Sequence, residues 1–150
     1  MKKTIFFFIF ILLNNCSGYS PIFSSKQINF YIEEIIVTED NKSIRKIVKN
    51  LKPYTERNDK KKIKLILDLE LNENVILRDA KGDVASEEIK VVLNVKSVLP
   101  NKEERKFQFE EKFVINNQSN KFELNQYKTS IRSTIIDKIY EDLILKLRSL

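Results

Sequence analysis

The chain has 150 residues, with 27 Lys and Arg against 21 Asp and Glu, a net charge of +6 and no histidine. The missing histidine removes the commonest general base and the usual metal ligand, and it excludes Ser-His and Cys-His nucleophile pairs. One cysteine cannot form a zinc site alone, and two glycines cannot form a phosphate-cradling loop. We therefore expect no enzyme, no cofactor and no metal.

The N-terminal residues have the pattern of an exported bacterial lipoprotein. A short cationic start precedes the unbroken apolar run Ile5 to Leu13, which is too short to cross a bilayer because a spanning helix needs roughly 20 apolar residues. The L-x-x-C spacing that ends at Cys16 is that of a lipobox, so we expect residues 1–15 to be a removed signal peptide and Cys16 to carry the lipid. Asn15 is larger than the small residue usual before cleavage. The alternative is that Cys16 is an ordinary thiol in a signal peptide cut elsewhere.

The residues after the cysteine indicate a short tether and an outer-membrane destination. Residues 16–26 are small, polar and turn-forming, and two or more acyl chains on Cys16 would anchor them stably. Ser17 stands where an aspartate would favour retention in the inner membrane, so we expect the protein at the cell outer membrane, facing the periplasm. Residues 27–150 have the length of one domain.

The first part of that domain predicts a strand and a helix. Apolar residues alternate from Ile28 to Ile32, and the run Ile35-Ile36-Val37 suggests a shift of phase or burial on both faces, so we predict a strand over 27–39. Asp40 and Asn41 are good helix caps. An amphipathic pattern follows and closes near Lys52, because Pro53 cannot continue a helix comfortably.

Three strands follow, all with a period of two. The first has apolar residues from Ile63 to Leu71, with Val75 and Leu77 in the same phase, which predicts one buried face. A turn at 80–83 leads to the alternation Ile89 to Val95, which makes a long hairpin. Pro100 and Asn101 mark another turn, and the last strand carries Phe107, Phe109, Phe113 and Ile115.

The chain closes with a long amphipathic helix. Asn120 and Glu123 have the spacing of an N-terminal cap, and a broad apolar stripe runs from Leu124 to Leu147. The order β-α-β-β-β-α predicts an α+β two-layer sandwich, with a four-stranded, largely antiparallel sheet and two helices on one face. Whether the first strand pairs in parallel remains open at this stage, and a right-handed crossover would be the default if it does.

Charged clusters offer few candidate sites. Adjacent carboxylates on a strand point to opposite faces, so we expect the four pairs to be solvated and not to converge; they are Glu33-Glu34, Glu87-Glu88, Glu103-Glu104 and Glu110-Glu111. Lys60-Lys61-Lys62 and the hairpin residues Arg78 and Lys81 could contact anionic lipid, or they could be solvated charges that guard strand ends. The mild positive charge could favour lipid phosphates or anionic polysaccharide, or could reflect nucleotide bias in the genome. Nucleic acid is a poor candidate for an exported protein.

The segment from Cys16 to Phe23, Cys-Ser-Gly-Tyr-Ser-Pro-Ile-Phe, resembles the C-G-[FY]-x-P-[LI]-[YF] start of mature lipopolysaccharide-assembly lipoproteins of the LptE type. Ser17 is an extra residue between the cysteine and the glycine. The element order and the closing helix also look like that family.

This resemblance implies a non-catalytic subunit of the outer-membrane lipopolysaccharide translocon, which sits as a plug inside the β-barrel partner LptD and helps its assembly. Only Cys16, as the lipid site, carries over by motif; Arg78 and Lys81 are candidates for binding lipopolysaccharide by their hairpin position alone. The alternatives are an unrelated lipoprotein, such as an auxiliary subunit of a lipid transporter or a pilotin-like chaperone, and an enzyme built on a carboxylate pair.

Overall fold

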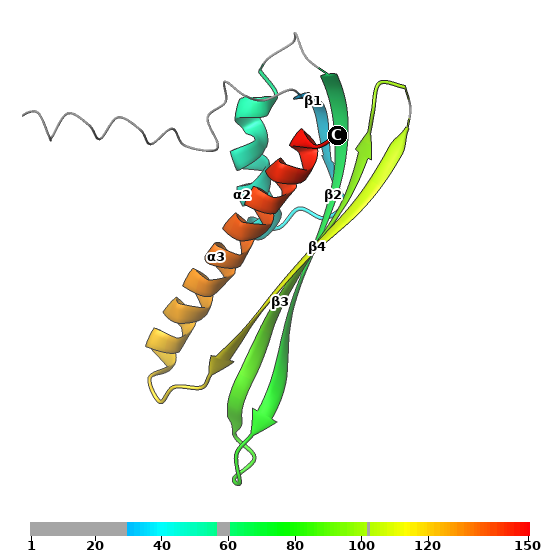
Figure 1. The fold of residues 1–150 in the computed structure, drawn as a ribbon. Coiled ribbons are helices and arrows are strands. Elements are labelled where there is room, and N and C mark those ends of the chain that lie inside the picture. Colours follow the sequence, from blue (N-terminus) through cyan, green and yellow to red (C-terminus); the bar gives the residue numbers. More distant parts are fainter. Residues whose placement is uncertain (1–29, 57–60, 102) are drawn as a thin grey trace, which may run out of the picture.

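The computed structural model describes residues 30–56, 61–101 and 103–150. The expected signal peptide, the tether and Cys16 lie outside the described residues. Four strands form one sheet in the order β1-β2-β3-β4, and both helices lie on the same side of it (Figure 1). The elements are β1 (Phe30–Val37), α2 (Lys42–Leu51), the 3-10 turn η2 (Lys52–Tyr54), β2 (Lys61–Arg78), β3 (Val84–Val98), β4 (Glu104–Asn116) and α3 (Lys121–Arg148). The predicted α+β fold is confirmed.

β1 is the one parallel strand, and it changes phase halfway along. It pairs with the first part of β2, so that Ile32 lies opposite Ile63 and Ile35 opposite Leu65, and the register shifts between Ile32 and Glu34. One extra residue in a strand moves the following side chains to the other face. This shift keeps both halves of β1 turned toward the core, as the run Ile35-Ile36-Val37 suggested.

α2 connects the two parallel strands. Its start is fixed by Asn41, whose side-chain oxygen accepts hydrogen bonds from the backbone N–H groups of Ser43 and Ile44 at 3.0 and 2.9 Å. Ile44, Ile47 and Leu51 form its buried face. The α-helical geometry ends before Pro53, which lies in η2, in agreement with the sequence.

The core lies between β2 and β3 on one side and the two helices on the other. β2 contributes the buried row Ile63, Leu65, Leu67 and Leu69, and β3 contributes the row from Ile89 to Val95 beside it. Both rows follow the predicted period of two. Each such side chain stabilises the fold by about 1.5–3 kcal/mol when it is fully buried, so these rows are the main source of stability.

α3 covers the β3–β4 half of the sheet. Asn120 caps it by accepting hydrogen bonds from the N–H groups of Phe122 and Glu123, and the helix buries residues along most of its 28-residue length, from Leu124 to Leu147. Tyr140 donates a hydrogen bond to the carbonyl oxygen of Asn50 at 3.1 Å, which joins α3 to α2. Burial raises the pKa of this phenol well above its usual value. Within the described ranges no helix is long and apolar enough to cross a membrane.

The stabilising role of the core face can be tested with two isoleucines. Ile139 is fully buried under the sheet-facing side of α3, whereas Ile36 is 45% exposed on β1. We expect Ile139→Ala to lower the free energy of unfolding by about 2–5 kcal/mol and Ile36→Ala by clearly less, measured by urea denaturation followed by circular dichroism. Equal losses in the two variants would contradict this packing.

Candidate functional site at the distal end of the sheet

The β2–β3 hairpin is longer than the layer of helices that covers it. β1 pairs only with residues 61–67 of β2, whereas the β2–β3 ladder continues as far as the pair Arg78 and Val84. The fully buried row of β2 ends at Leu69, and Leu71 is partly buried. We call the part beyond this row the distal end: residues 72–88 of the hairpin, 112–116 of β4 and 117–132 in the first turns of α3. It lies toward the bottom of Figure 1.

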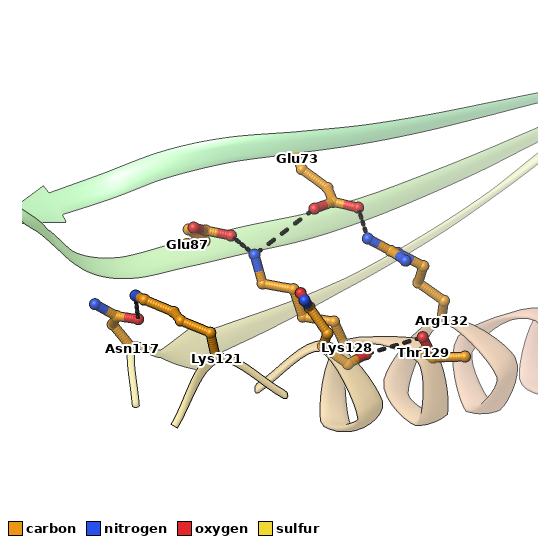
Figure 2. A network of polar contacts seen from close by, with 8 residues as sticks. Glu73, Glu87, Asn117, Lys121, Lys128, Thr129 and Arg132 are labelled. Atoms are coloured by element: carbon orange, nitrogen blue, oxygen red, sulfur yellow. Dashed lines mark hydrogen bonds and ion pairs between the residues drawn. The ribbon is translucent and has the colours of Figure 1, made fainter. Parts of the chain in front are cut away.

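An ion network fills the space between the distal hairpin and α3 (Figure 2). The Lys128 ammonium group lies between two carboxylates, forming an ion pair with Glu87 and lying 3.9 Å from Glu73 Oε2. Arg132, one turn further along α3, pairs with the other oxygen of Glu73. Only 13% of the Lys128 side chain is exposed. A charge this enclosed depends on its partners, because its own hydration is largely lost.

The strand period explains why these carboxylates face the helix. Glu73 continues the phase of the leucine row of β2, and Glu87 continues the phase of Ile89 on β3. Both side chains therefore point to the helix side of the sheet, where aliphatic side chains stand nearer the core. Lys128 and Arg132 are four residues apart and so share one face of α3. Strand and helix periods together bring the four charges into one cluster.

The expectation that the paired glutamates are solvated is wrong for Glu87 and Glu111. Glu111 also faces the helix, and its Oε1 lies 2.6 Å from Lys138 Nζ. These two carboxylates are the least exposed in the ion pairs of the described ranges, because α3 covers them. The adjacent members, Glu88 and Glu110, lie on the opposite face of the sheet. The pairs do not converge, as the alternation predicts.

The Lys128 network can be tested by removing its central charge. Lys128→Met leaves Glu73 and Glu87 partly buried with less positive charge beside them, so we expect unfolding to become easier by about 1–3 kcal/mol. Lys81→Met, at the exposed hairpin tip, should change stability by less than about 0.5 kcal/mol. Chemical denaturation measures both.

A second variant separates the charge from the shape of the lysine. In the double variant Glu87→Gln/Lys128→Met the uncompensated carboxylate is gone, so part of the lost stability should return. If the double variant loses as much unfolding free energy as the two single variants together, Glu87 and Lys128 are not energetically coupled.

Apolar side chains are unusually exposed at the distal end. Nine large apolar residues are exposed in the described part of the chain, and seven of them lie here: Val75, Ile76, Leu77, Phe113, Val114, Phe122 and Tyr127. The rings of Phe113 and Tyr127 meet edge to face at 6.4 Å. Scattered exposed apolar residues are ordinary, but a concentration of them marks an interaction surface. The distal end is therefore the best candidate for binding.

The prediction that Val75 and Leu77 share the buried face of β2 is wrong. Val75 has the expected phase, but the helix layer has ended there and the side chain is exposed. Leu77 lies beyond a register shift, opposite Ser86, and is 59% exposed. A bulge turns side chains to the other face, and no periodicity in a single strand reveals its position.

The hairpin tip holds Arg78 and Lys81, the two predicted lipopolysaccharide-binding residues. Asp79 Oδ1 accepts hydrogen bonds from the N–H groups of Lys81 and Asp83, both at 2.9 Å, and Gly82 takes the positive φ of 86° that the turn requires. Arg78 Nη1 donates to the Gly82 carbonyl oxygen at 2.9 Å. The tip thus places both cations next to the exposed run Val75 to Leu77, although Arg78 also braces the turn.

The other basic cluster lies at the opposite end of β2 and contacts the protein itself. Lys61 Nζ donates to the Leu150 carbonyl oxygen at 2.7 Å, and Lys62 Nζ lies 3.7 Å from Glu33 Oε1. Lys60 lies outside the described residues. Lys61 therefore links β2 to Leu150, and Lys62 links β2 to β1. Both lie at the other end of β2 from Arg78 and Lys81.

A groove of about 1090 Å³ separates α2 from α3 above β2. Leu69, Leu71 and Ile136 supply apolar surface, and the charged residues of the lining are Lys42, Arg45, Lys46, Lys49, Arg132, Glu39, Asp68 and Glu70. Lys46 spans it, donating to Ser133 Oγ at 2.6 Å and to Asp137 at 2.7 Å. Over the described ranges no group of three or more Cys, Asp or Glu side chains could hold a metal ion. Its mixed charge gives the groove no chemical preference that names a ligand.

The fold is shared with several solved lipoprotein structures. A minor lipoprotein from Acinetobacter baumannii has a TM-score of 0.57 and 9% identity, covering 81% of this chain and 91% of that one. A putative lipoprotein from Caulobacter crescentus has a TM-score of 0.54 and 12% identity, covering 79% of this chain and 88% of that one. The rare lipoprotein B from Shewanella oneidensis has a TM-score of 0.53 and 18% identity, covering 75% of this chain and 91% of that one. No family model matches the chain, and no curated protein matches it. At these identities the similarity establishes a common fold.

Proposed function

We propose that this protein is an outer-membrane lipoprotein that serves as the plug and assembly subunit of the lipopolysaccharide transport translocon, bound to the barrel LptD. The observation that carries the proposal is a coincidence of two independent features. The N-terminal segment from Cys16 to Phe23 resembles the LptE type, and the domain behind it has a fold found in three proteins named as lipoproteins, nearly to their full length.

The surface of the domain supports a binding role. Apolar side chains gather at the distal end, and Arg78 and Lys81 stand beside them at the hairpin tip. Lipopolysaccharide carries anionic groups next to acyl chains, so such a surface suits it by both charge and apolarity. We propose that the hairpin tip contacts lipopolysaccharide and that the apolar distal end contacts the barrel wall. Neither contact needs a catalytic residue.

The second candidate is a periplasm-facing lipoprotein of another pathway, either an auxiliary subunit of a lipid transporter or a pilotin-like chaperone. It is favoured by the same lipidation signal and by the fold, which is shared with lipoproteins whose names specify no partner. The partner that copurifies distinguishes the two candidates, since an inner-membrane transporter or a secretin would replace LptD.

Co-purification tests the barrel proposal. The full chain, tagged at its C-terminus and expressed in its own host, should bring down LptD from detergent-solubilised outer membranes. Leu77→Asp places a charge in the exposed apolar run and should lower the recovered LptD at least about fivefold. Ile36→Asp makes the same kind of change at another exposed apolar site, on β1, and should leave recovery near the unmodified level. Absence of LptD from the pull-down would contradict the proposal.

Mass spectrometry tests the lipid anchor. The mature protein should begin at Cys16, with its thiol and its new amine both acylated, because stable anchoring needs more than one chain. Cys16→Ser should leave the protein in the soluble periplasmic fraction or uncleaved. A free Cys16 thiol, or a mature N-terminus at another residue, would show that the signal peptide is cut elsewhere and would refute the lipoprotein assignment.

A further inference from the structure

Among the described residues no strand pairs with the outer side of β4, and the backbone groups on that side can be assigned. The Leu99 N–H donates to the Glu103 carbonyl oxygen at 3.0 Å, and the Asn117 N–H donates to the Ala85 carbonyl oxygen at 2.8 Å. Both bonds flank the β3–β4 ladder and fix its phase, because hydrogen-bonded pairs alternate in an antiparallel ladder. Odd-numbered residues of β4 therefore bond to β3, and even-numbered residues turn their N–H and C=O groups away from the sheet.

The sequence of this edge is complementary to itself. When two copies of β4 run antiparallel with Gln108 opposite Gln108, the even-numbered residues form the new hydrogen-bonded pairs, as their outward backbone groups require. Every flanking pair then matches in charge or in apolarity: Phe107 with Phe109, Lys106 with Glu110, Arg105 with Glu111, and Glu104 with Lys112. Each of these pairs occurs twice by symmetry.

Neighbouring registers lack this match. A centre on Phe109 places Lys106 opposite Lys112, and a centre on Phe107 places Glu104 opposite Glu110. Like charges directly opposite each other destabilise a strand pair. The two-fold axis must also pass through a residue and not between two residues, because otherwise side chains from opposite faces of the sheet would be paired. Of these three registers, the pairing centred on Gln108 is the one that the charges favour.

α3 adds an apolar contact close to the same centre. Lys146 stacks over the Phe107 ring at 5.1 Å, and Lys138 pairs with Glu111, so α3 runs along β4 with residues 144–145 above Gln108. Leu145 is two turns from Lys138 and so lies on the same side of the helix. It is 50% exposed, the one large apolar side chain of the described part of α3 that is open outside the distal end.

We propose that β4 is a self-pairing edge, through which a second copy of this chain binds antiparallel about Gln108 and joins the two sheets into one. The ion pairs that hold Glu104 to Lys96 at 2.8 Å and Glu110 to Lys90 at 3.0 Å can persist, because each carboxylate accepts several hydrogen bonds. Tethering both copies to one membrane would raise their effective concentration. The inference does not rest on the proposed function, and it concerns a surface apart from the distal end. A copy enclosed as a plug in a barrel could not pair in this way, so the dimer is the form of the protein outside the barrel.

Disulfide trapping tests the position of the symmetry axis. Gln108→Cys brings two copies of the new thiol to Cα atoms about 5.5 Å apart, within disulfide range. The control Lys112→Cys is on the same face but roughly 27 Å from its copy, eight strand positions at about 3.4 Å each. The full chain in detergent, mildly oxidised, should give a covalent dimer for Gln108→Cys alone. Equal dimer from Lys112→Cys, or from the unmodified chain with Cys16, would overturn the proposal.

Charge exchange tests the pairing itself. In the Gln108→Cys background, Lys106→Glu places two carboxylates opposite each other at two symmetric places, and we expect the trapped dimer to fall about tenfold. Adding Glu110→Lys restores opposite charges across the axis and should return most of the dimer. A trapped dimer that is unchanged by Lys106→Glu, or not restored by the exchange, would show that the edges do not pair in this register.

A backbone substitution tests the hydrogen bonds of the edge. The Lys106 N–H points away from β3, so Lys106→Pro should leave the β3–β4 ladder intact and remove two bonds of the dimer. We expect a native circular dichroism spectrum and at least about tenfold less trapped dimer in the Gln108→Cys background. A folded variant that dimerises as before would overturn the proposal. Phe107→Pro is the control, because it removes a hydrogen bond to β3. We expect this variant to lose native structure, whereas Lys106→Pro should keep it.

Discussion

The fold depends on one apolar row, the helix-facing side of β2. β2 pairs in parallel with β1 and antiparallel with β3, so it is the strand that joins the βαβ unit to the meander. On its helix-facing side Ile63, Leu65, Leu67 and Leu69 are almost fully buried. Two helices can cover only one face of such a sheet. The opposite face must therefore be polar, and the alternation of the strands provides this.

The length of that row determines what the rest of the hairpin can do. Beyond Leu71 the hairpin continues without a full layer above it, and the residues in the same phase become Glu73 and Val75. Carboxylates here are enclosed enough to need Lys128 and Arg132, which α3 provides. The ion network thus fixes the distal hairpin to the helix where apolar packing has ended. A rigid hairpin can then present exposed apolar residues without burying them.

Much of the fold could be predicted because local rules and long-range packing agree in this sequence. Asn41 and Asn120 cap helices in the structure as the sequence predicts. The α-helical part of α2 ends before Pro53, because proline cannot continue the helix. The phase shift in β1 falls at Glu33, before the apolar run that suggested it, so the sequence indicated a change of phase but not its position.

The candidate site was harder to predict because its properties depend on how far the helices extend over the β2–β3 hairpin. Val75 and Leu77 continue the pattern of the buried row, and nothing in a strand's own periodicity reports the length of a helix packed on it. Glu87 and Glu111 look like any exposed acid, yet α3 lies over them. The signal that could have identified them was available in part. Both share a strand face with aliphatic or aromatic neighbours, and α3 carries Lys128 and Lys138 at positions that can reach that face.

The two edges of the sheet are exposed to pairing in different ways. β1 is short, with eight residues, and its register shift near Glu33 bends it; both features discourage edge pairing. β4 has thirteen residues and pairs with β3 without any register shift. Its protection is charge, since four of its outward residues carry charged side chains: Glu104, Lys106, Glu110 and Lys112.

Charge protects an edge only against strands that fail to match it. Side-chain hydrogen bonds from Lys90 and then Lys112 hold the pKa of the Glu110 carboxyl below its usual value, so this carboxylate keeps its negative charge to a lower pH than a free glutamate. The positive half lies on the other side of Gln108. A strand with this antisymmetric pattern repels most partners but attracts its own copy in reverse. The device that guards β4 against general aggregation is thus the same one that makes it selective for itself.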